Sequence, residues 1–250
     1  MRVLSIDLDY IMEPSIEIYN DLFYAGNPMT RWRTFFEKTP FNNNSFEINI
    51  SNLMYCYNVF LKSLKNCDKV SFGYTHDSIL YSIEDFNNIE LINIDHHDDV
   101  FAGDFYDDYP SDSLQKEYAE IVYSNRIHEG NWVAYLSSRN KIKSYTWIGN
   151  HNSANKVRNE PNSHFVPNYS NVERENYNFA DYNFDHIFVC LSPQYIPHKF
   201  WHYFAMFITA YEEFTGKDAM IEGWANRSFE HDRRYSQTTD EILYQCSTGR

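Results

Sequence analysis

Short, almost uninterrupted apolar segments recur along the chain, and they constrain its fold more than any other feature. The near-continuous apolar character is expected of strands buried on both faces, as in a parallel sheet covered by helices. Stretches of helical periodicity lie between them, and this alternation predicts an α/β fold with a mainly parallel sheet. The predicted strands are residues 2–6, 69–72, 90–94, 144–148 and 186–191.

Helical periodicity is clearest in residues 50–64, where six apolar side chains fall on one stripe of a helix. We also predict helices over residues 114–124, 131–140 and 197–214. Residues 150–182 are polar and rich in Asn, with little periodicity. That composition predicts an excursion from the sheet, either a lid or a loop that contacts a substrate.

Length and charge restrict the class of protein. A chain of 250 residues with 43% hydrophobic residues can close one sizeable core, so we expect a single domain over residues 1–250. The 21 Lys and Arg against 35 Asp and Glu give a net charge of −14. This acidic field disfavours binding to nucleic acid and favours cationic partners such as metal ions or arginine-bearing substrates.

Cysteine usage and hydropathy indicate the compartment. The four cysteines are scattered, without a Cys-x-x-Cys pair, which is typical of free thiols in a reducing cytoplasm. No run of about 18 apolar residues is present, so we expect no membrane-spanning segment. The N-terminus reaches Asp7 before any signal-like apolar stretch develops. We therefore expect a cytoplasmic protein.

Acidic residues and histidines stand directly after three of the predicted strands. Residues at positions i and i+2 near a strand end project to the same side of the strand. In a parallel sheet the carboxyl ends of the strands meet at one edge, where ligand sites form. We therefore expect six side chains to converge: Asp7, Asp9, His76, Asp95, His97 and Asp99.

This mixture of carboxylates and imidazoles predicts a metal centre. Carboxylates packed together repel one another and take up protons unless cations neutralise them. Two divalent ions would balance the charge and make water nucleophilic near neutral pH. A set dominated by carboxylates suits Mn²⁺ better than a thiolate-dominated zinc site would. An Asp-x-Asp pair alone is most often a turn and a lone histidine most often a core residue, so the prediction depends on their joint occurrence.

The same three segments resemble motifs of the ureohydrolase superfamily, which contains the arginases and agmatinases. Asp95-x-His97-x-Asp99 resembles its DxHxD motif, residues 5–9 resemble its strand that ends in DxD, and residues 73–78 are similar to its first histidine motif. The resemblance implies an arginase/deacetylase-like three-layer sandwich. In arginases the DxD motif comes last, whereas here it opens the chain, so the resemblance also implies a circularly permuted fold.

The resemblance assigns the six side chains to two Mn²⁺ ions. By analogy, one ion would be held by His76, Asp95, Asp99 and Asp7. The other would be held by His97, Asp95, Asp7 and Asp9, so that Asp95 and Asp7 would bridge the two ions.

A branch of this superfamily matches further residues. Leu8-Asp9-Tyr10 and Glu129-x-Asn131-Trp132 are similar to motifs of an arginase-like branch that includes peptide arginases. These enzymes convert arginine side chains of ribosomally made precursor peptides to ornithine and release urea. Arginases carry a Ser-Gly-Asn-x-His sequence after the DxHxD strand, and in this chain Val133 takes the place of that histidine.

The implied hydrolysis gives roles to four residues. Asp99 is a candidate to accept a proton from the attacking water. Glu129 is our candidate to hold the guanidinium group, because a carboxylate matches that planar cation with paired hydrogen bonds; as an alternative, it is an exposed loop residue that caps the following helix. Asn131 would contact the substrate or cap the same helix. His128 would shuttle protons in place of the missing histidine, or is a surface imidazole.

Three other classes compete with this interpretation. A manganese phosphoesterase of the DHH type would match Asp95-His96-His97 literally, but such enzymes carry a histidine where this chain has Val3. A zinc deacetylase of related fold would leave His76, Asp9 and Asp99 without a role. A non-catalytic, metal-stabilised peptide-binding protein would use the same ligands without turnover. The sequence gives no indication of the oligomeric state.

Overall fold

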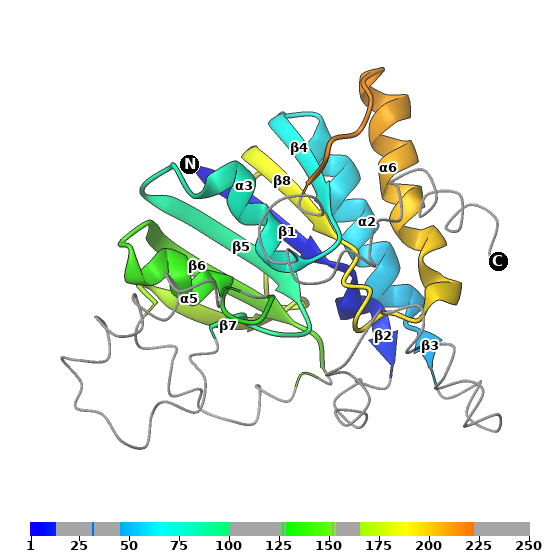
Figure 1. Cartoon of the computed structure of the whole chain (residues 1–250), viewed down its shortest axis with the longest axis horizontal. Helices are drawn as coiled ribbons and strands as arrows, with labels where there is room; N and C mark the ends of the chain where they lie inside the picture. The colour runs from blue at the N-terminus through cyan, green and yellow to red at the C-terminus, as the bar shows by residue number, and fades with distance from the viewer. Residues whose placement is uncertain are drawn as a thin grey trace, which may run out of the picture.

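Seven parallel strands form the central sheet of the computed structural model, which describes residues 1–13, 32, 46–100, 127, 129–151, 153 and 166–222. They lie in the order β7-β6-β5-β1-β8-β4-β9, and each neighbouring pair is parallel (Figure 1). The strands are β1 (Arg2–Asp7), β4 (Cys67–Gly73), β5 (Ile89–Asp95), β6 (Ile142–Gly149), β7 (Tyr169–Glu173), β8 (Phe184–Cys190) and β9 (Ile221–Glu222). All five predicted strands are confirmed.

Helices cover both faces of the sheet, as in a three-layer sandwich. Helices α2 (Ile50–Leu64) and α6 (His202–Thr215) lie side by side on one face (Figure 1). Helices α3 (Leu80–Ile83) and α5 (Trp132–Ser138) contribute to a separate core on the other face. Side chains of β1 alternate between the two cores, with Ile6 in the first and Val3 in the second.

The boundaries of the long helices follow from local chemistry. Helix α2 occupies the predicted range, and its cap is the side chain of Asn49, which accepts a hydrogen bond from the backbone N–H of Asn52 at 3.0 Å. The predicted helix over 197–214 is divided into the 3₁₀ turn η8 (His198–Phe200) and α6. Helix α6 ends at Gly216, whose φ of 67° lies in the left-handed region that favours glycine.

One of the connecting segments differs in part from its prediction. The excursion predicted over residues 150–182 is wrong for residues 169–173, because these form β7 and pair with β6. As an edge strand, β7 is only partly buried, so its polar sequence lacks the apolar run that marks the inner strands. The helix predicted over residues 114–124 lies outside the described residues.

Short elements follow strands β1 and β4 directly. The 3₁₀ turn η1 (Leu8–Ile11) leads into β2 (Met12–Glu13), which pairs antiparallel with β3 (Glu47–Ile48). A second 3₁₀ turn, η4 (His76–Ile79), follows β4. Within the described ranges, no helix combines the length and the apolar character needed to cross a membrane.

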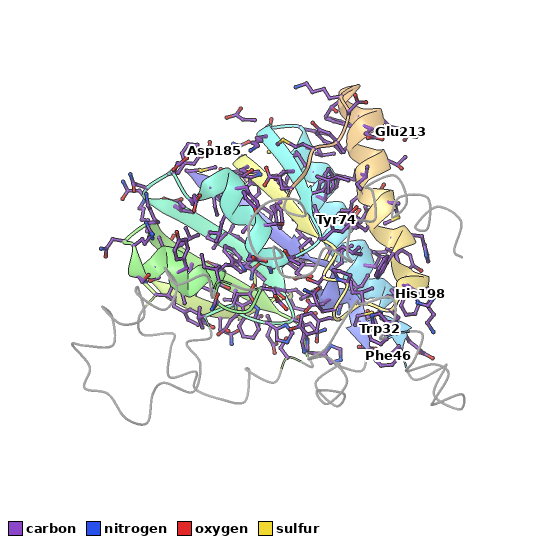
Figure 2. All side chains as sticks on the ribbon, in the orientation of Figure 1. Trp32, Phe46, Tyr74, Asp185, His198 and Glu213 are labelled. Atoms are coloured by element: carbon purple, nitrogen blue, oxygen red, sulfur yellow. The ribbon has the colours of Figure 1, made fainter. Side chains whose placement is uncertain are left out.

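An aromatic contact fixes the loop that follows β8. Trp32 and Phe46, labelled in Figure 2, pack edge to face with ring centroids 5.3 Å apart. The buried indole N–H of Trp32 donates to the carbonyl oxygen of Pro193 at 3.0 Å. The contact therefore anchors a loop at the carboxyl edge of the sheet, where the predicted site lies.

Candidate metal centre

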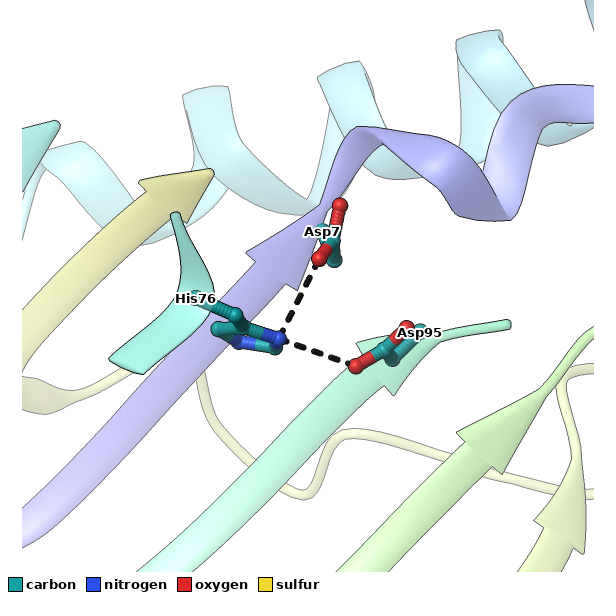
Figure 3. Close-up of side chains that lie close together, drawn as sticks. All are labelled: Asp7, His76 and Asp95. Atoms are coloured by element: carbon teal, nitrogen blue, oxygen red, sulfur yellow. Dashed lines mark ion pairs between the residues drawn. The ribbon is translucent and has the colours of Figure 1, made fainter. Parts of the chain in front are cut away.

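The six predicted ligands come from the carboxyl ends of three strands. Asp7 ends β1 and Asp95 ends the neighbouring strand β5, while Asp9 lies in η1. His76 begins η4, just beyond β4. His97 and Asp99 lie in the loop that follows β5. Because all three strands run in the same direction, the structure brings these side chains together at one edge. Figure 3 shows three of them, Asp7, His76 and Asp95.

His76 is the centre of the first group of ligand atoms. Its Nδ1 lies 2.8 Å from Oδ2 of Asp99, 3.0 Å from Oδ2 of Asp95 and 3.2 Å from Oδ2 of Asp7. The Oγ of Ser5 lies 2.6 Å from Nε2 on the opposite side of the ring. The buried Nδ1 makes no hydrogen bond of good geometry within the described residues. An imidazole nitrogen enclosed by carboxylate oxygens fits a divalent cation.

Asp9, Asp95 and His97 form a second group beside the first. One ligand atom of each lies within 4.8 Å of the others, and the same holds for Asp7, His76 and Asp95 in the first group. Nδ1 of His97 lies 3.1 Å from Oδ2 of Asp9. Asp95 belongs to both groups and therefore connects them. These buried Asp and His groups can hold a metal ion.

The charges in the site raise the pKa of several members. Burial and the charges of Asp7 and Asp95 raise the pKa of Asp9 well above its ordinary value. Burial and the charges of Asp99 and Asp7 raise the pKa of Asp95 to about 7. Burial acts to lower the pKa of His97, but its hydrogen bond to Asp9 helps to raise it to about 10. Without a cation the group therefore retains protons, and metal binding would release them.

Aromatic donors hold the segment that carries Asp95, His97 and Asp99. The indole N–H of Trp147 donates to the carbonyl oxygen of Asp95 at 3.0 Å. The buried indole of Trp132 donates to Oδ2 of Asp99 at 2.5 Å.

Two tyrosines hold the neighbouring residue Asp98. Tyr145 donates to the carbonyl oxygen of Asp98, and Tyr169 donates to its carboxylate. Asp99 has a φ of 54°, which is strained for a residue with a Cβ, and these contacts hold it there.

Sequence reasoning missed the loop after β8, which reaches the same site. The hydroxyl of Ser192 donates to Oδ2 of Asp7 across 2.5 Å, and Ser192 itself has a φ of 49°. The ring of Tyr195 lies 5.2 Å from that of His97, centroid to centroid. No periodic pattern marks this loop, and the only signal in the sequence is its place directly after a buried strand.

The predicted substrate residues lie just before α5. Glu129 is half-buried, and its Oε1 accepts a hydrogen bond from Nε2 of Gln194 at 3.4 Å. Asn131 is buried and occupies the N-cap position of α5, but its side chain makes no capping hydrogen bond. The capping alternative for Asn131 is therefore not observed. His128 lies outside the described residues.

Two titratable residues, His96 and Asp77, lie next to predicted ligands in the chain. His96 is 5% exposed and belongs to neither group of ligand atoms in the described part of the chain. Its Nδ1 lies 3.5 Å from Oγ of Ser153. Burial and the neighbouring Glu129 carboxylate raise the pKa of Asp77 to about 6. Alternate residues of the segment 95–99 thus face the site, as the spacing predicts.

Comparison with known proteins adds no further assignment. No protein-family model, curated protein or solved structure significantly matches this chain. A buried, carboxylate-rich set with a minority of imidazole can hold a divalent metal ion.

Proposed function

We propose that this protein is a manganese-dependent peptide arginase, which hydrolyses arginine side chains of a ribosomally made precursor peptide to ornithine and urea. The observation that carries the proposal is the pair of Asp/His groups that share Asp95 at the carboxyl edge of the sheet. Their members come from the three sequence motifs that resemble those of ureohydrolases. The acidic net charge of −14 is compatible with a cationic substrate.

The proposed site would hold two Mn²⁺ ions. His76, Asp7, Asp95 and Asp99 would hold one ion, and Asp7, Asp9, Asp95 and His97 the other. Divalent ions supply Lewis acidity, which makes water nucleophilic near neutral pH and stabilises negative charge that develops in the reaction.

The residues of this chain would direct the remaining chemistry. Water adds to Cζ of the arginine side chain, the Cζ–Nε bond breaks, and the amine leaves as ornithine while Cζ departs in urea. Asp99, whose Oδ2 lies 2.8 Å from Nδ1 of His76 in the first group, would accept a proton from the water and pass it to Nε as the Cζ–Nε bond breaks. Glu129 would hold the guanidinium group through paired hydrogen bonds.

The arrangement of the motif-bearing strands is compatible with a circularly permuted arginase-like fold. The DxD strand β1 opens the chain but lies directly beside the DxHxD strand β5. The strand that precedes the histidine motif, β4, comes before β5 in the chain, as in arginases. We therefore propose that the termini are relocated while the site is retained.

The decisive experiment offers the Mn²⁺-loaded protein an arginine-containing peptide, free arginine, agmatine and a phosphodiester. We expect the peptide to lose CH₂N₂ per converted arginine, with one urea formed for each, as read by mass spectrometry and a urea assay. The Asp95→Asn variant, which lacks the shared carboxylate, is expected to lose this activity. Conversion that persists after exhaustive chelation would contradict the metal-dependent mechanism.

Two alternatives are separated by the same experiment. Release of phosphate without any change in arginine would support a DHH-type phosphoesterase. Against that class, His96 of the Asp-His-His run lies outside both groups of ligand atoms in the described residues. Binding of the peptide without conversion would support a non-catalytic, metal-stabilised peptide-binding protein.

A further inference from the structure

The loop after β8 brings a carboxamide to the candidate guanidinium-binding carboxylate. Nε2 of Gln194 donates to Oε1 of Glu129 at 3.4 Å, although 65 residues separate the two in the chain. Glu129 comes from the turn before α5, and Gln194 from the opposite side of β1 in the sheet order. The pair therefore joins two segments that approach the site from different strands.

The position of Gln194 is fixed by its neighbours. The hydroxyl of Ser192 is bonded to Asp7, and the carbonyl oxygen of Ser192 accepts the backbone N–H of Tyr195 at 2.9 Å and that of Ile196 at 3.1 Å. The carbonyl oxygen of Pro193 accepts the indole N–H of Trp32. These bonds form a tight turn around Gln194, so its side chain is presented from a rigid segment.

The orientation of the Gln194 carboxamide leaves one strong acceptor without a partner. Because Glu129 offers only acceptor oxygens, the NH₂ group of Gln194 must face it. Oε1 of Gln194 is buried and has no hydrogen-bond partner within the described residues. A buried polar oxygen without a partner is costly, and a ligand that supplies an N–H would satisfy it.

Residues that flank Gln194 in the chain lie beside the predicted metal ligands, and the hydroxyl of Ser192 donates to Asp7. Tyr195 follows Gln194 in the chain. Its burial and the nearby charges of Glu129, Asp9 and Asp99 raise the pKa of its hydroxyl well above the ordinary value. The ring of Tyr195 also contacts that of His97. A group held between Gln194 and Glu129 would therefore approach the Asp/His groups.

We propose that Gln194 and Glu129 together bind the guanidinium group of the substrate. Glu129 accepts two of its N–H groups, while Gln194 orients Glu129 and accepts a further N–H at its buried Oε1. This inference rests on the proposed function, since it identifies the substrate group that the same site receives. A guanidinium carries five N–H donors in a planar fork, whereas an ammonium is a compact charge that cannot span both acceptors.

The test compares cations that differ in this geometry. Binding of ethylguanidinium and of ethylammonium to the metal-loaded protein is measured by titration calorimetry, alongside KM and kcat for an arginine peptide. Gln194→Met keeps the length of the side chain and removes its polar atoms. In this variant we expect ethylguanidinium to bind about tenfold more weakly, which corresponds to a loss of about 1.4 kcal/mol of binding free energy. The preference over ethylammonium should fall by a similar factor, and KM should rise more than kcat falls.

A matched control lies at the other end of the same strand. Asn183 is exposed and precedes β8, so Asn183→Leu also removes a carboxamide but should change neither binding nor turnover. Circular dichroism and melting temperature establish that each variant is folded. If Gln194→Met does not fold, Gln194→Ala serves in its place. Binding of ethylguanidinium by the folded variant as tight as in the natural protein would overturn the inference.

The outcomes also separate this inference from the proposed function. Gln194-dependent binding of ethylguanidinium without conversion of any arginine would support the inference and contradict the arginase proposal. Conversion of arginine with unchanged KM in the Gln194 variant would support the arginase and overturn the role of Gln194. Absence of both binding and conversion in the natural protein would overturn both.

Discussion

The hydroxyl of Ser5 lies 2.6 Å from Nε2 of His76, on the side of the imidazole opposite the nitrogen that faces Asp7, Asp95 and Asp99. This contact orients the ring so that Nδ1 faces the carboxylates, and with a cation bound Nε2–H would donate to Oγ of Ser5. The outer hydrogen bond of a ligating histidine commonly sets its orientation and basicity in this way. The relationship makes Ser5 part of the metal centre although it is not a predicted ligand.

Substitution Ser5→Ala is therefore expected to weaken metal binding. Loss of an outer hydrogen bond to a ligand typically costs about 10- to 100-fold in metal affinity or activity. The control is Ser71→Ala, because the Oγ of Ser71 makes an equivalent contact with Nε2 of His186 at 2.8 Å, away from the site. Both variants should lose about 1 kcal/mol of stability. Equal Mn²⁺ affinity of the two, measured by titration against a chelating indicator, would contradict this role of Ser5.

The bond from Trp132 to Asp99 leads to a second prediction. Trp132→Phe keeps an aromatic ring beside His76, where the centroids lie 4.8 Å apart, but removes the N–H donated to Asp99. We expect the affinity for Mn²⁺ or the turnover to fall about 10- to 100-fold. Trp201→Phe, which removes an indole N–H from the carbonyl oxygen of Ile196, should leave both unchanged. Titration of Mn²⁺ against a chelating indicator and a turnover assay test this, and a Trp132 variant with unchanged affinity and full turnover would exclude the role.

The inner sheet and the ligands could be predicted because each leaves a local pattern. Strands such as β8 are buried on both faces, so a continuous apolar run marks them. Asp95, His97 and Asp99 alternate directly after such a run, and the geometry of a strand end makes alternate residues face one point. The strand order was not needed, because the carboxyl ends of all parallel strands lie at the same edge.

The remaining parts of the site depend on tertiary contacts that have no local signature. Ser192 and Gln194 reach Asp7 and Glu129 only after β8 has inserted between β1 and β4. Trp147 appears in sequence as one more core aromatic, because its donor role depends on where the carbonyl oxygen of Asp95 lies. Strand β7 was missed for a related reason, since pairing on one side only leaves it partly exposed.

Removal of metal should change stability in a pH-dependent way. Asp95 has a pKa of about 7 in the folded protein, above its ordinary 3.8. The stability gained from its proton is therefore fully present below about pH 4 and is lost as the pH rises through 7. His97, with a pKa of about 10, continues this loss above pH 6.5. Added Mn²⁺ should therefore raise the melting temperature of the chelated protein more at pH 8 than at pH 5.

Calorimetric melts with chelator and with excess Mn²⁺ test this prediction at each pH. The difference between the two conditions cancels groups that titrate elsewhere in the protein. Asp95→Asn lacks both the titrating group and the shared ligand, so its Mn²⁺-induced gain should be small at both pH values. A Mn²⁺-induced gain that is the same at pH 5 and pH 8 would contradict the account.

His186 should cause the opposite dependence on pH, independent of the metal. It is fully buried, and burial together with the charge of Lys69 lowers its pKa to about 3 from an ordinary value of 6.5. Between these values the unfolded chain binds a proton that the folded protein does not, so stability falls as the pH falls from 6.5. The slope from this group is at most about 1.4 kcal/mol per pH unit.

In His186→Gln that slope should disappear, whereas His202→Gln, at an exposed position, should keep it. Urea unfolding between pH 4.5 and 7 in the presence of chelator measures the slopes, and identical slopes for the natural protein and His186→Gln would show that His186 is not the buried neutral group described.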